Sequence, residues 1–408
     1  MTARFLQIHT LTSYPASLLN RDDAGFAKRM PFGGAIRTRV SSQCLKRHWR
    51  MYDGENGLKN LAAPESVRSR ESFERYIVKP LVDEGTEPAL ARTAAQKIVS
   101  LLFTSEAEQD RAERKGGRKK ADEPDAPGGD DGVVKTSQVT VLGRPELDYL
   151  CQLARQAVAD AGGDRAKIEK VIQDRMKNNK ELKKNIQALK PGSLEAGLSA
   201  ALFGRMVTGD VLARTDAAIH VAHAITVHGQ QTESDYFSVI DDLIREDGKQ
   251  ESGHINASEL TSGVFYGYVV IDVHGLLKNL GGEEPDHLAS AHGLAGDVVE
   301  RLVQMIATVS PGAKKGSTAP YAYSHLVLVE SGNAQPRTLQ NAFVEPVRTS
   351  GNIIHNAYQA LASHLADLDA MYGKGEERAH AGLQAGDLFE GGMSLASLAA
   401  WAKARVVA

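Results

Sequence analysis

Cysteine is nearly absent from this chain, and the two cysteines that occur cannot build a disulfide framework. Cys44 and Cys151 lie far apart among 408 residues, with no further cysteine to pair with either. A disulfide-based fold and a zinc site made of several cysteines are therefore excluded, and a reducing compartment, the cytoplasm, is expected.

Long apolar runs are missing as well. No stretch of about eighteen apolar residues occurs, which is the length needed to span a membrane as a helix. The first residues, MTARFLQIHTLTS, lack the long apolar segment of a secretory signal. We expect no membrane span and no membrane partner.

An excess of positive charge is also absent. The formal net charge is −3, and the chain is 42% hydrophobic and 24% charged, which is ordinary for a globular protein. The length allows two or more domains. Because the total charge does not favour a polyanion, a nucleic-acid partner would have to be recognised through locally segregated basic residues.

Such segregation occurs in residues 20–50, which hold eight Lys/Arg against two acids, Asp22 and Asp23. The segment continues through a Gly33-Gly34 turn and an alternating strand to a helix that starts near Ser41-Ser42. Basic side chains and free backbone N–H groups at a helix N-terminus favour a phosphate chain. The alternative for the helical half is an ordinary amphipathic helix with a solvated basic side. The basic residues are Arg21, Lys28, Arg29, Arg37, Arg39, Lys46, Arg47 and Arg50.

A second basic face is predicted on a helix over residues 164–189. Its apolar residues fall on one side at 100° per residue, and four lysines fall within an arc of about 80° on the other. The pattern requires a helix that is unbroken through Asn178-Asn179, and a solvated face is an equally good interpretation. The four lysines are Lys170, Lys177, Lys180 and Lys184.

Three histidines, His220, His223 and His228, could suggest a metal site. The surrounding residues 216–228 alternate in polarity and are rich in β-branched residues, which predicts a strand. On a strand His220 and His228 share a face but lie roughly 26 Å apart, and His223 points the opposite way. We therefore expect structural roles for all three histidines and no bound metal.

The remaining periodicities predict an α+β fold. Helices are expected over 65–103, with breaks near Pro80 and Pro88, and over 146–161, 194–203, 356–371 and 394–406. Residues 105–135 are charged, rich in Gly and Pro, and predicted to be a disordered insertion. Without the insertions, the order is strand (5–12), helix (42–50), strands (216–228 and 262–273), helix (289–309) and strand (324–330). This βαββαβ order is that of the ferredoxin-like fold, the scaffold of RNA-recognition modules.

A series of short motifs carries a resemblance to a known family. The motifs are LNRDD (19–23), FGG (32–34), RTRVSSQCLKR (37–47), GRM (204–206), AHAIT (222–226), TSGVFY (261–266) and PGAK (311–314). Together and in this order they resemble the CasC family, the repeating backbone subunit of the type I-E CRISPR Cascade complex. The resemblance extends from residue 1 to about residue 350.

The resemblance implies a hand-shaped subunit. Residues 1–54, 205–228 and 262–408 would form an RRM-like (ferredoxin-like) palm, 55–204 helical fingers, and 229–261 a β-hairpin thumb. Copies of the subunit would line up as a helical filament along a guide RNA (crRNA), together with other Cascade subunits. The guide would then be presented to target DNA in antiviral defence, in the cytoplasm.

The resemblance also implies which residues bind RNA. Met206 would lie near the bases, although a core position is a comparable alternative. Phe237, with Ser238 and Ile255, would form a wedge at a kink in the RNA, unless Phe237 packs within its own hairpin. The backbone contacts would be Asn20, Arg21, Lys28, Ser41, Gln43, Lys46 and Arg50. The basic finger residues would be Lys177, Lys180, Lys183 and Lys184.

Two alternatives compete with this scaffold role. The first is a metal-dependent ribonuclease, because related backbone subunits of other CRISPR systems cleave target RNA. The pairs Asp22-Asp23 and Asp241-Asp242 are adjacent residues whose side chains diverge on extended backbone, so neither is a ready metal site. The second is a generic RNA-binding metabolic protein. We expect a non-catalytic chain without a cofactor.

Overall fold

The structure is a computed structural model that describes residues 3–103, 132–176, 196–205, 215–238, 255–281, 287–383 and 391–407. The chain divides into two compact units. The first comprises Met1–Leu61, Ile219–Val273 and Ala295–Ala408. The second comprises Ala62–Ala218 and His274–Leu294. In the described ranges, each helix is too short or too polar to cross a membrane.

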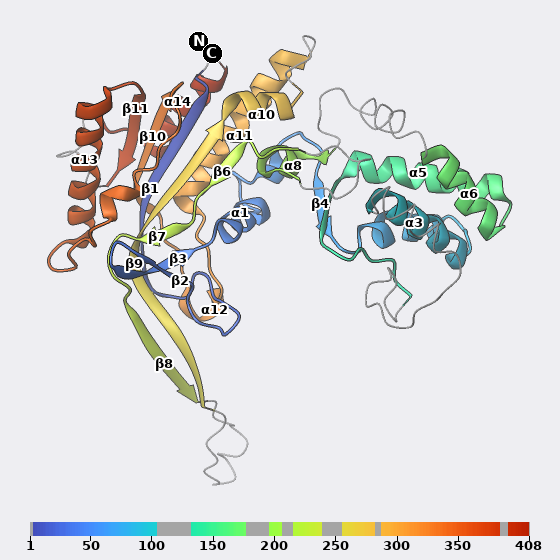
Figure 1. The fold of residues 1–408 in the computed structure, drawn as a ribbon, viewed down its shortest axis with the longest axis horizontal. Coiled ribbons are helices and arrows are strands. Elements are labelled where there is room, and N and C mark those ends of the chain that lie inside the picture. The colour runs from blue at the N-terminus through green and yellow to red at the C-terminus, as the bar shows by residue number, and fades with distance from the viewer. Residues whose placement is uncertain are drawn as a thin grey trace, which may run out of the picture. The chain divides into compact units, whose positions relative to one another are not determined.

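The first unit is built on one antiparallel sheet with the order β11-β10-β1-β9-β7-β3-β2, and β6 and β8 also pair with β9 (Figure 1). This arrangement confirms the predicted α+β class. The strands are β1 (Phe5–Ser17), β2 (Arg29–Phe32), β3 (Ala35–Val40), β6 (Ile219–Val221), β7 (Ala224–Thr226), β8 (Thr232–Ser238), β9 (Ile255–Asp272), β10 (Ser324–Gly332) and β11 (Glu377–Gly382).

The central strand β1 is longer than predicted. Its pairing with β9 runs from Phe5↔Asp272 to Ser17↔Thr261, with an irregularity after Tyr14. The prediction ended the strand at residue 12, where a Ser- and Pro-containing segment begins. The strand continues because β9 also pairs with Ser13, Tyr14 and Ser17.

The predicted strand over 216–228 is in fact two short strands, β6 and β7. Val221 pairs with Val269, and Ile225 pairs with Tyr266. Four steps along one strand therefore match three along the other, so one extra residue is accommodated as a bulge. The continuous-strand prediction was wrong here because a bulge leaves no mark on the alternation of polarity.

Helices cover both faces of the sheet. One face carries a core in which Tyr266 and Phe343 pack with α13, and the other carries Tyr14, Val40 and Phe265. Phe265 and Tyr266 are buried, and Tyr268 is half-buried. The helices are α1 (Ser42–Met51), η1 (Leu58–Asn60), α11 (Leu288–Thr308, in this unit from Ala295), α12 (Lys315–Thr318), η5 (Gln340–Phe343), α13 (Ile353–Tyr372) and α14 (Leu395–Val407).

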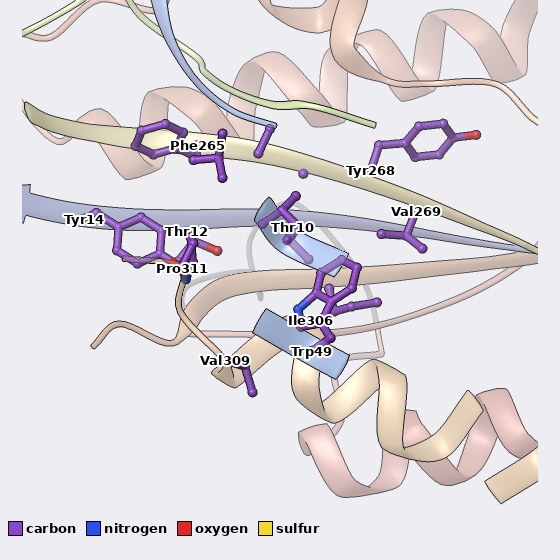
Figure 2. A pocket seen from close by; sticks show the side chains of 14 residues that line it. Thr10, Thr12, Tyr14, Trp49, Phe265, Tyr268, Val269, Ile306, Val309 and Pro311 are labelled. Carbon is purple, nitrogen blue, oxygen red and sulfur yellow. The ribbon is translucent and has the colours of Figure 1, made fainter. Parts of the chain in front are cut away.

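A small cavity lies under α1. Trp49 and Ile306 line it from the helices, and Thr10 and Val269 line it from the sheet (Figure 2). Its volume is about 50 Å³, far below the roughly 300 Å³ at which ligand pockets begin. It is a packing defect behind the helix, too small to hold a nucleotide.

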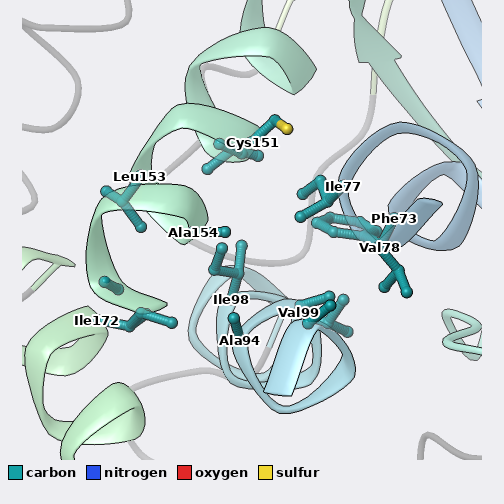
Figure 3. Close-up of a cluster of buried hydrophobic side chains, with 14 of the residues drawn as sticks. Phe73, Ile77, Val78, Ala94, Ile98, Val99, Cys151, Leu153, Ala154 and Ile172 are labelled. Atoms are coloured by element: carbon teal, nitrogen blue, oxygen red, sulfur yellow. The ribbon is translucent and has the colours of Figure 1, made fainter. Parts of the chain in front are cut away.

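The second unit is mainly helical around its own core. Phe73, Ile77, Ile98 and Ile172 are fully buried there (Figure 3). Its elements are β4 (Ser66–Ser69), the π-helix η2 (Glu74–Val78), α2 (Lys79–Asp83), α3 (Pro88–Phe103), β5 (Thr140–Gly143), α5 (Arg144–Ala161), α6 (Arg165–Met176), α8 (Leu198–Phe203) and α10 (Val273–Asn279, in this unit from His274).

Two predictions made from the sequence concern residues of this unit. Residues 66–69 were predicted as helix but pair as a strand with β5, a long-range contact that local periodicity does not reveal. Most of the predicted insertion 105–135 lies outside the described residues. Its last four residues are described, and Val134 is buried and donates its N–H to Glu74 Oε2 at 2.9 Å.

A buried ionic network joins β1, β10 and β11 in the first unit. Glu330 is fully buried and accepts hydrogen bonds from His9 Nε2 (3.2 Å), Arg337 Nη1 (2.6 Å) and Arg378 Nε (2.6 Å). Burial by itself raises the pKa of Glu330, but the hydrogen bonds from His9 and the two arginines outweigh it and hold this pKa well below its ordinary value. Burial lowers the pKa of His9, which is therefore neutral at pH 7.

Replacing Glu330 should test this network. Glu330→Gln leaves two arginines facing a neutral amide, so we expect the free energy of unfolding at pH 7 to fall by about 3 kcal/mol in urea titrations. Because the folded pKa is depressed, the carboxylate stabilises the fold above its unfolded pKa of about 4.3 and ceases to do so as the pH falls toward the folded value. The difference between wild type and variant should therefore narrow below about pH 4.3.

Glu377→Gln is the matched control. Glu377 lies on the same strand as Arg378, and its exposed carboxylate pairs with Arg405 at 2.7 Å. Its loss should lower the free energy of unfolding by less than about 1 kcal/mol. Equal losses for the two variants, or a Glu330→Gln difference that does not change with pH, would contradict the role assigned to Glu330.

Candidate nucleic-acid interface

The basic segment folds as a loop, a hairpin and a helix within the first unit. Loop 20–28 leads into the β2–β3 hairpin, and α1 follows directly. Ser41 is the N-cap of α1, as the Ser41-Ser42 pattern predicted, and its Oγ accepts the Cys44 N–H at 3.3 Å. Trp49 anchors the apolar side of α1 in the core.

Loop 20–28 is closed by its own backbone. Lys28 N donates to Asn20 O at 2.9 Å, and Arg21 forms an antiparallel bridge with Ala27. Asp22 completes the turn, because its Oδ1 accepts the Phe26 N–H at 2.9 Å. This pattern presents Arg21 and Lys28 from opposite arms of one small hairpin.

Asn20 links this loop to the start of α1. Its side-chain Oδ1 accepts the Ser41 N–H at 2.9 Å. Within the described part of the chain no hydrogen bond from the Asn20 Nδ2 is found, which leaves two N–H donors for an acceptor from outside. The Ser41 hydroxyl accepts the capping bond and can still donate its proton.

The polar side of α1 extends a row of polar and basic residues that begins with Asn20, Arg21 and Lys28 in the loop and passes through Ser41. Gln43, Lys46 and Arg50 are three and four residues apart, so they lie along one side of the helix. Gln43 is exposed, whereas Lys46 and Arg50 are half-buried. Burial lowers the pKa of Lys46 from its ordinary value near 10.5, and the amine remains charged at pH 7.

Further cations gather around this row. Burial raises the pKa of the Cys44 thiol, and the positive charges of Arg47, Lys28 and Lys315 oppose that rise. Lys315 begins α12, which follows a segment held to the residue after β1 by Ala313 N donating to Leu18 O at 2.9 Å. Arg47 was among the eight basic residues of the segment, but neither it nor Lys315 was predicted to contact RNA. The available signal for Lys315 was the PGAK motif, which ends at the preceding residue, Lys314.

The two arginines of β3 have different environments. Arg37 is fully buried and donates to Thr226 O (3.0 Å) and Phe343 O (2.8 Å), so it serves the fold. Gly33 packs so closely on the same segment that an added Cβ would lie 1.6 Å from Val344 O. Arg39 is half-buried and lies 3.1 Å from His223 Nδ1. Their shared strand gave no sign of this difference.

The histidines have separate local partners. His228 is buried, and its ring hydrogen-bonds Gly229 O (2.7 Å) and Val264 N (3.1 Å). His223 lies beside Arg39, as described above. Within the described ranges, no group of three or more His, Cys, Asp or Glu residues is arranged to hold a metal ion.

The three predicted wedge residues lie together at the end of the β8–β9 hairpin. Phe237 pairs with Asn256, and Ser238 pairs with Ile255, on the last rungs of the ladder. Tyr236, the preceding residue on β8, is 73% exposed. The backbone therefore places Phe237, Ser238 and Ile255 at one location.

The remaining predicted residues, Lys177, Lys180, Lys183, Lys184 and Met206, lie outside the described residues. The described residue before Met206 is Arg205, in the second unit. Arg205 is buried and pairs with the buried Glu146 at 2.6 Å. On α6 the predicted apolar side is confirmed, since Ile168, Ile172 and Met176 are buried.

Comparison with solved structures places this fold among CRISPR complex subunits. One chain titled "CRISPR RNA-guided surveillance complex, pre-nicking" is similar with a TM-score of 0.74 and 26% identity, over 98% of this chain and 100% of that one. Another, titled "CRISPR RNA-guided surveillance complex", has a TM-score of 0.62 and 23% identity, over 98% of this chain and 99% of that one. At 23% identity, the second likeness shows the fold alone.

Comparison by sequence gives the family. A search of curated proteins found no match. The family described as CT1975-like protein matches residues 6–400, which is nearly the whole chain. The chain therefore belongs to the CT1975-like family of Cas proteins.

Proposed function

We propose that this chain is a CasC-type backbone subunit of a type I-E Cascade complex that binds guide RNA without catalysing a reaction. Several copies would polymerise as a helical filament along the spacer, beside other Cascade subunits, and present the guide for pairing with target DNA. The observation that carries this proposal is the continuous polar row from loop 20–28 along α1, in a chain that resembles a surveillance-complex subunit over 98% of its length.

The strand order supports a ferredoxin-like palm. Reduced to the strands that correspond to the βαββαβ order, the first unit has β10, β1, β9 and β7 as adjacent antiparallel strands, with α1 and α11 as the crossover helices. This is the order that a βαββαβ chain produces when both crossovers are right-handed. The helical second unit corresponds to the fingers of the proposal, and the β8–β9 hairpin corresponds to the thumb.

The chemistry of the row suits a guide of any sequence. Phosphates and 2′-hydroxyls are the same at every nucleotide, so contacts to them carry no base preference. Arg21, Lys28, Lys46 and Arg50 supply charge, while Asn20, Ser41 and Gln43 supply hydrogen bonds in fixed directions. The bond from Ser41 N to Asn20 Oδ1 sets the spacing between the loop contacts and the helix contacts.

The hairpin end would act on the bases. An apolar side chain inserted between bases costs a few kcal/mol of lost stacking, so it needs a rigid support and a fixed backbone path for the RNA. The paired positions of Phe237, Ser238 and Ile255 on the last rungs of the hairpin supply such a support. Met206 and the lysines Lys177, Lys180, Lys183 and Lys184 are proposed as further contacts from the palm and fingers.

The non-catalytic part of the proposal is supported by how Asp22 is used. Its carboxylate accepts the Phe26 N–H and closes the loop turn, a structural role that competes with metal binding. Two free cysteines, Cys44 and Cys151, support the cytoplasm as the working compartment. The ribonuclease alternative would need Asp22 to be available for metal chemistry.

The row predicts a specific change in salt dependence. Replacing Lys28, Lys46 and Arg50 together by alanine should weaken binding to all guide sequences alike. Three lost phosphate contacts should reduce the slope of log affinity against log salt by about 2. Fluorescence anisotropy with several single-stranded RNAs between low and physiological salt would measure both effects.

The matched control is the triple replacement of Lys79, Arg348 and Lys374, three exposed cations on other elements, which removes the same charge. Its slope should stay close to that of the wild type. If both triple variants have the same slope, or if the first keeps the wild-type slope, the assignment of the row is wrong. Degradation of the RNA in added Mg²⁺ that Asp22→Ala abolishes would indicate a ribonuclease instead.

The hairpin end predicts a defect of a different kind. Phe237→Ala should leave the salt slope and the guide affinity within about twofold, because it removes no phosphate contact. It should reduce pairing of the bound guide with complementary DNA, since the kink that displays the bases loses its wedge. Tyr236→Ala, at the neighbouring position, is the control, and equal effects of the two changes on DNA pairing would contradict the wedge.

A further inference from the structure

Glu259 connects the β8–β9 hairpin to loop 20–28. Along β9 the pairing with β1 ends at Ser17↔Thr261, so residues before Thr261 are paired only on the side of β8, where Glu259 faces Ser234. From this position the Glu259 Oε2 accepts the Ala27 N–H at 2.6 Å. The carboxylate thus bridges the hairpin and the loop.

Ala27 is the point through which the whole loop can be held. It is 1% exposed and forms the bridge to Arg21, and Lys28 directly follows it. Because Lys28 N is also bound to Asn20 O, a fixed Ala27 leaves little freedom to the backbones of both cations. A contact at Ala27 therefore determines where Arg21 and Lys28 can place their charges.

Electrostatic attraction to RNA cannot explain a carboxylate at this location. Loop 20–28 contains two basic residues, Arg21 and Lys28, and two acids, Asp22 and Asp23, so its formal charge is zero. An additional negative charge repels phosphate. What Glu259 offers instead is a hydrogen-bond acceptor whose reach matches the buried Ala27 N–H.

We propose that Glu259 is a positioning residue that fixes the distance between the phosphate contacts of loop 20–28 and the wedge at Phe237. The ladder partner of Phe237, Asn256, lies three residues before Glu259, which is about 10 Å along the strand. The carboxylate thereby holds the loop and the hairpin at a fixed distance from each other along the RNA backbone. This inference rests on the proposed guide-RNA function.

Two substitutions separate geometry from charge. Glu259→Gln keeps a side-chain oxygen at the same reach and removes the charge, whereas Glu259→Asp keeps the charge and withdraws it by one methylene, about 1.5 Å. If positioning is what matters, Glu259→Asp should weaken guide-RNA binding about tenfold, and Glu259→Gln should stay within about twofold of wild type. If only charge mattered, Glu259→Asp would equal wild type and Glu259→Gln would bind more tightly.

Glu233→Gln and Glu233→Asp are the matched controls. Glu233 is exposed on the same hairpin, opposite Leu260, and has the same charge. Binding would be measured by anisotropy with a single-stranded guide RNA, and the register by chemical probing of the 2′-hydroxyls of the bound RNA. We expect the periodic contrast in 2′-hydroxyl reactivity along the bound guide to be lost in Glu259→Asp alone. The melting temperature of the protein should be unchanged in all four variants.

These measurements distinguish failure of the positioning role of Glu259 from failure of the proposed guide-RNA binding. Wild-type affinity and probing pattern in Glu259→Asp would overturn the inference while leaving guide-RNA binding intact. The inference would also be overturned if Glu259→Gln gained as much affinity for guide RNA as Glu233→Gln and lost the periodic 2′-hydroxyl reactivity of the bound RNA. This comparison tests the inference even if Glu259→Asp does not fold. Failure of the wild type to bind guide RNA would instead refute the proposed function.

Discussion

A single asparagine side chain holds the two halves of the candidate interface in register. Asn20 accepts the Ser41 N–H through Oδ1 and the Lys28 N–H through its backbone oxygen. One residue therefore sets both the entry to α1 and the closure of loop 20–28. These bonds fix the backbone from which the cations extend, so a polyanion that binds the row meets a backbone already in place. Preorganisation of this kind lowers the ordering entropy of binding.

The sheet beneath the interface is stiffened by buried charges that serve structure. Arg37 is saturated by backbone carbonyls, among them Thr226 O and Phe343 O, and ties β3 to neighbouring segments. Glu330 joins β1, β10 and β11 through His9, Arg337 and Arg378. Losing one partner of such a group is strongly destabilising, so the geometry around it is well defined. The buried Arg37 and Glu330 beneath the interface thus find their partners within the protein, while Arg21 and Gln43 remain exposed.

Much of the fold and part of the site could be predicted from sequence, because both depend on local patterns. The Ser41 cap, the existence of β3 and the apolar side of α6 follow from local signals, and the structure confirms them. What failed depends on distant partners: the bulge between β6 and β7 is set by β9, and β4 exists only through β5. Likewise, no local pattern separates the buried Arg37 from the half-buried Arg39, or reveals that Glu259 meets Ala27.

In the proposed filament many copies of this chain bind one RNA end to end, so the length of RNA that they protect is the quantity to measure. The protein would be purified with its bound RNA and treated with an external ribonuclease, and the protected fragments would be sized on a denaturing gel. We predict protected RNA many subunit footprints long, lengthening in even steps as more protein is loaded. Fragments that never exceed the footprint of one subunit, or the absence of any protected RNA, would contradict the account.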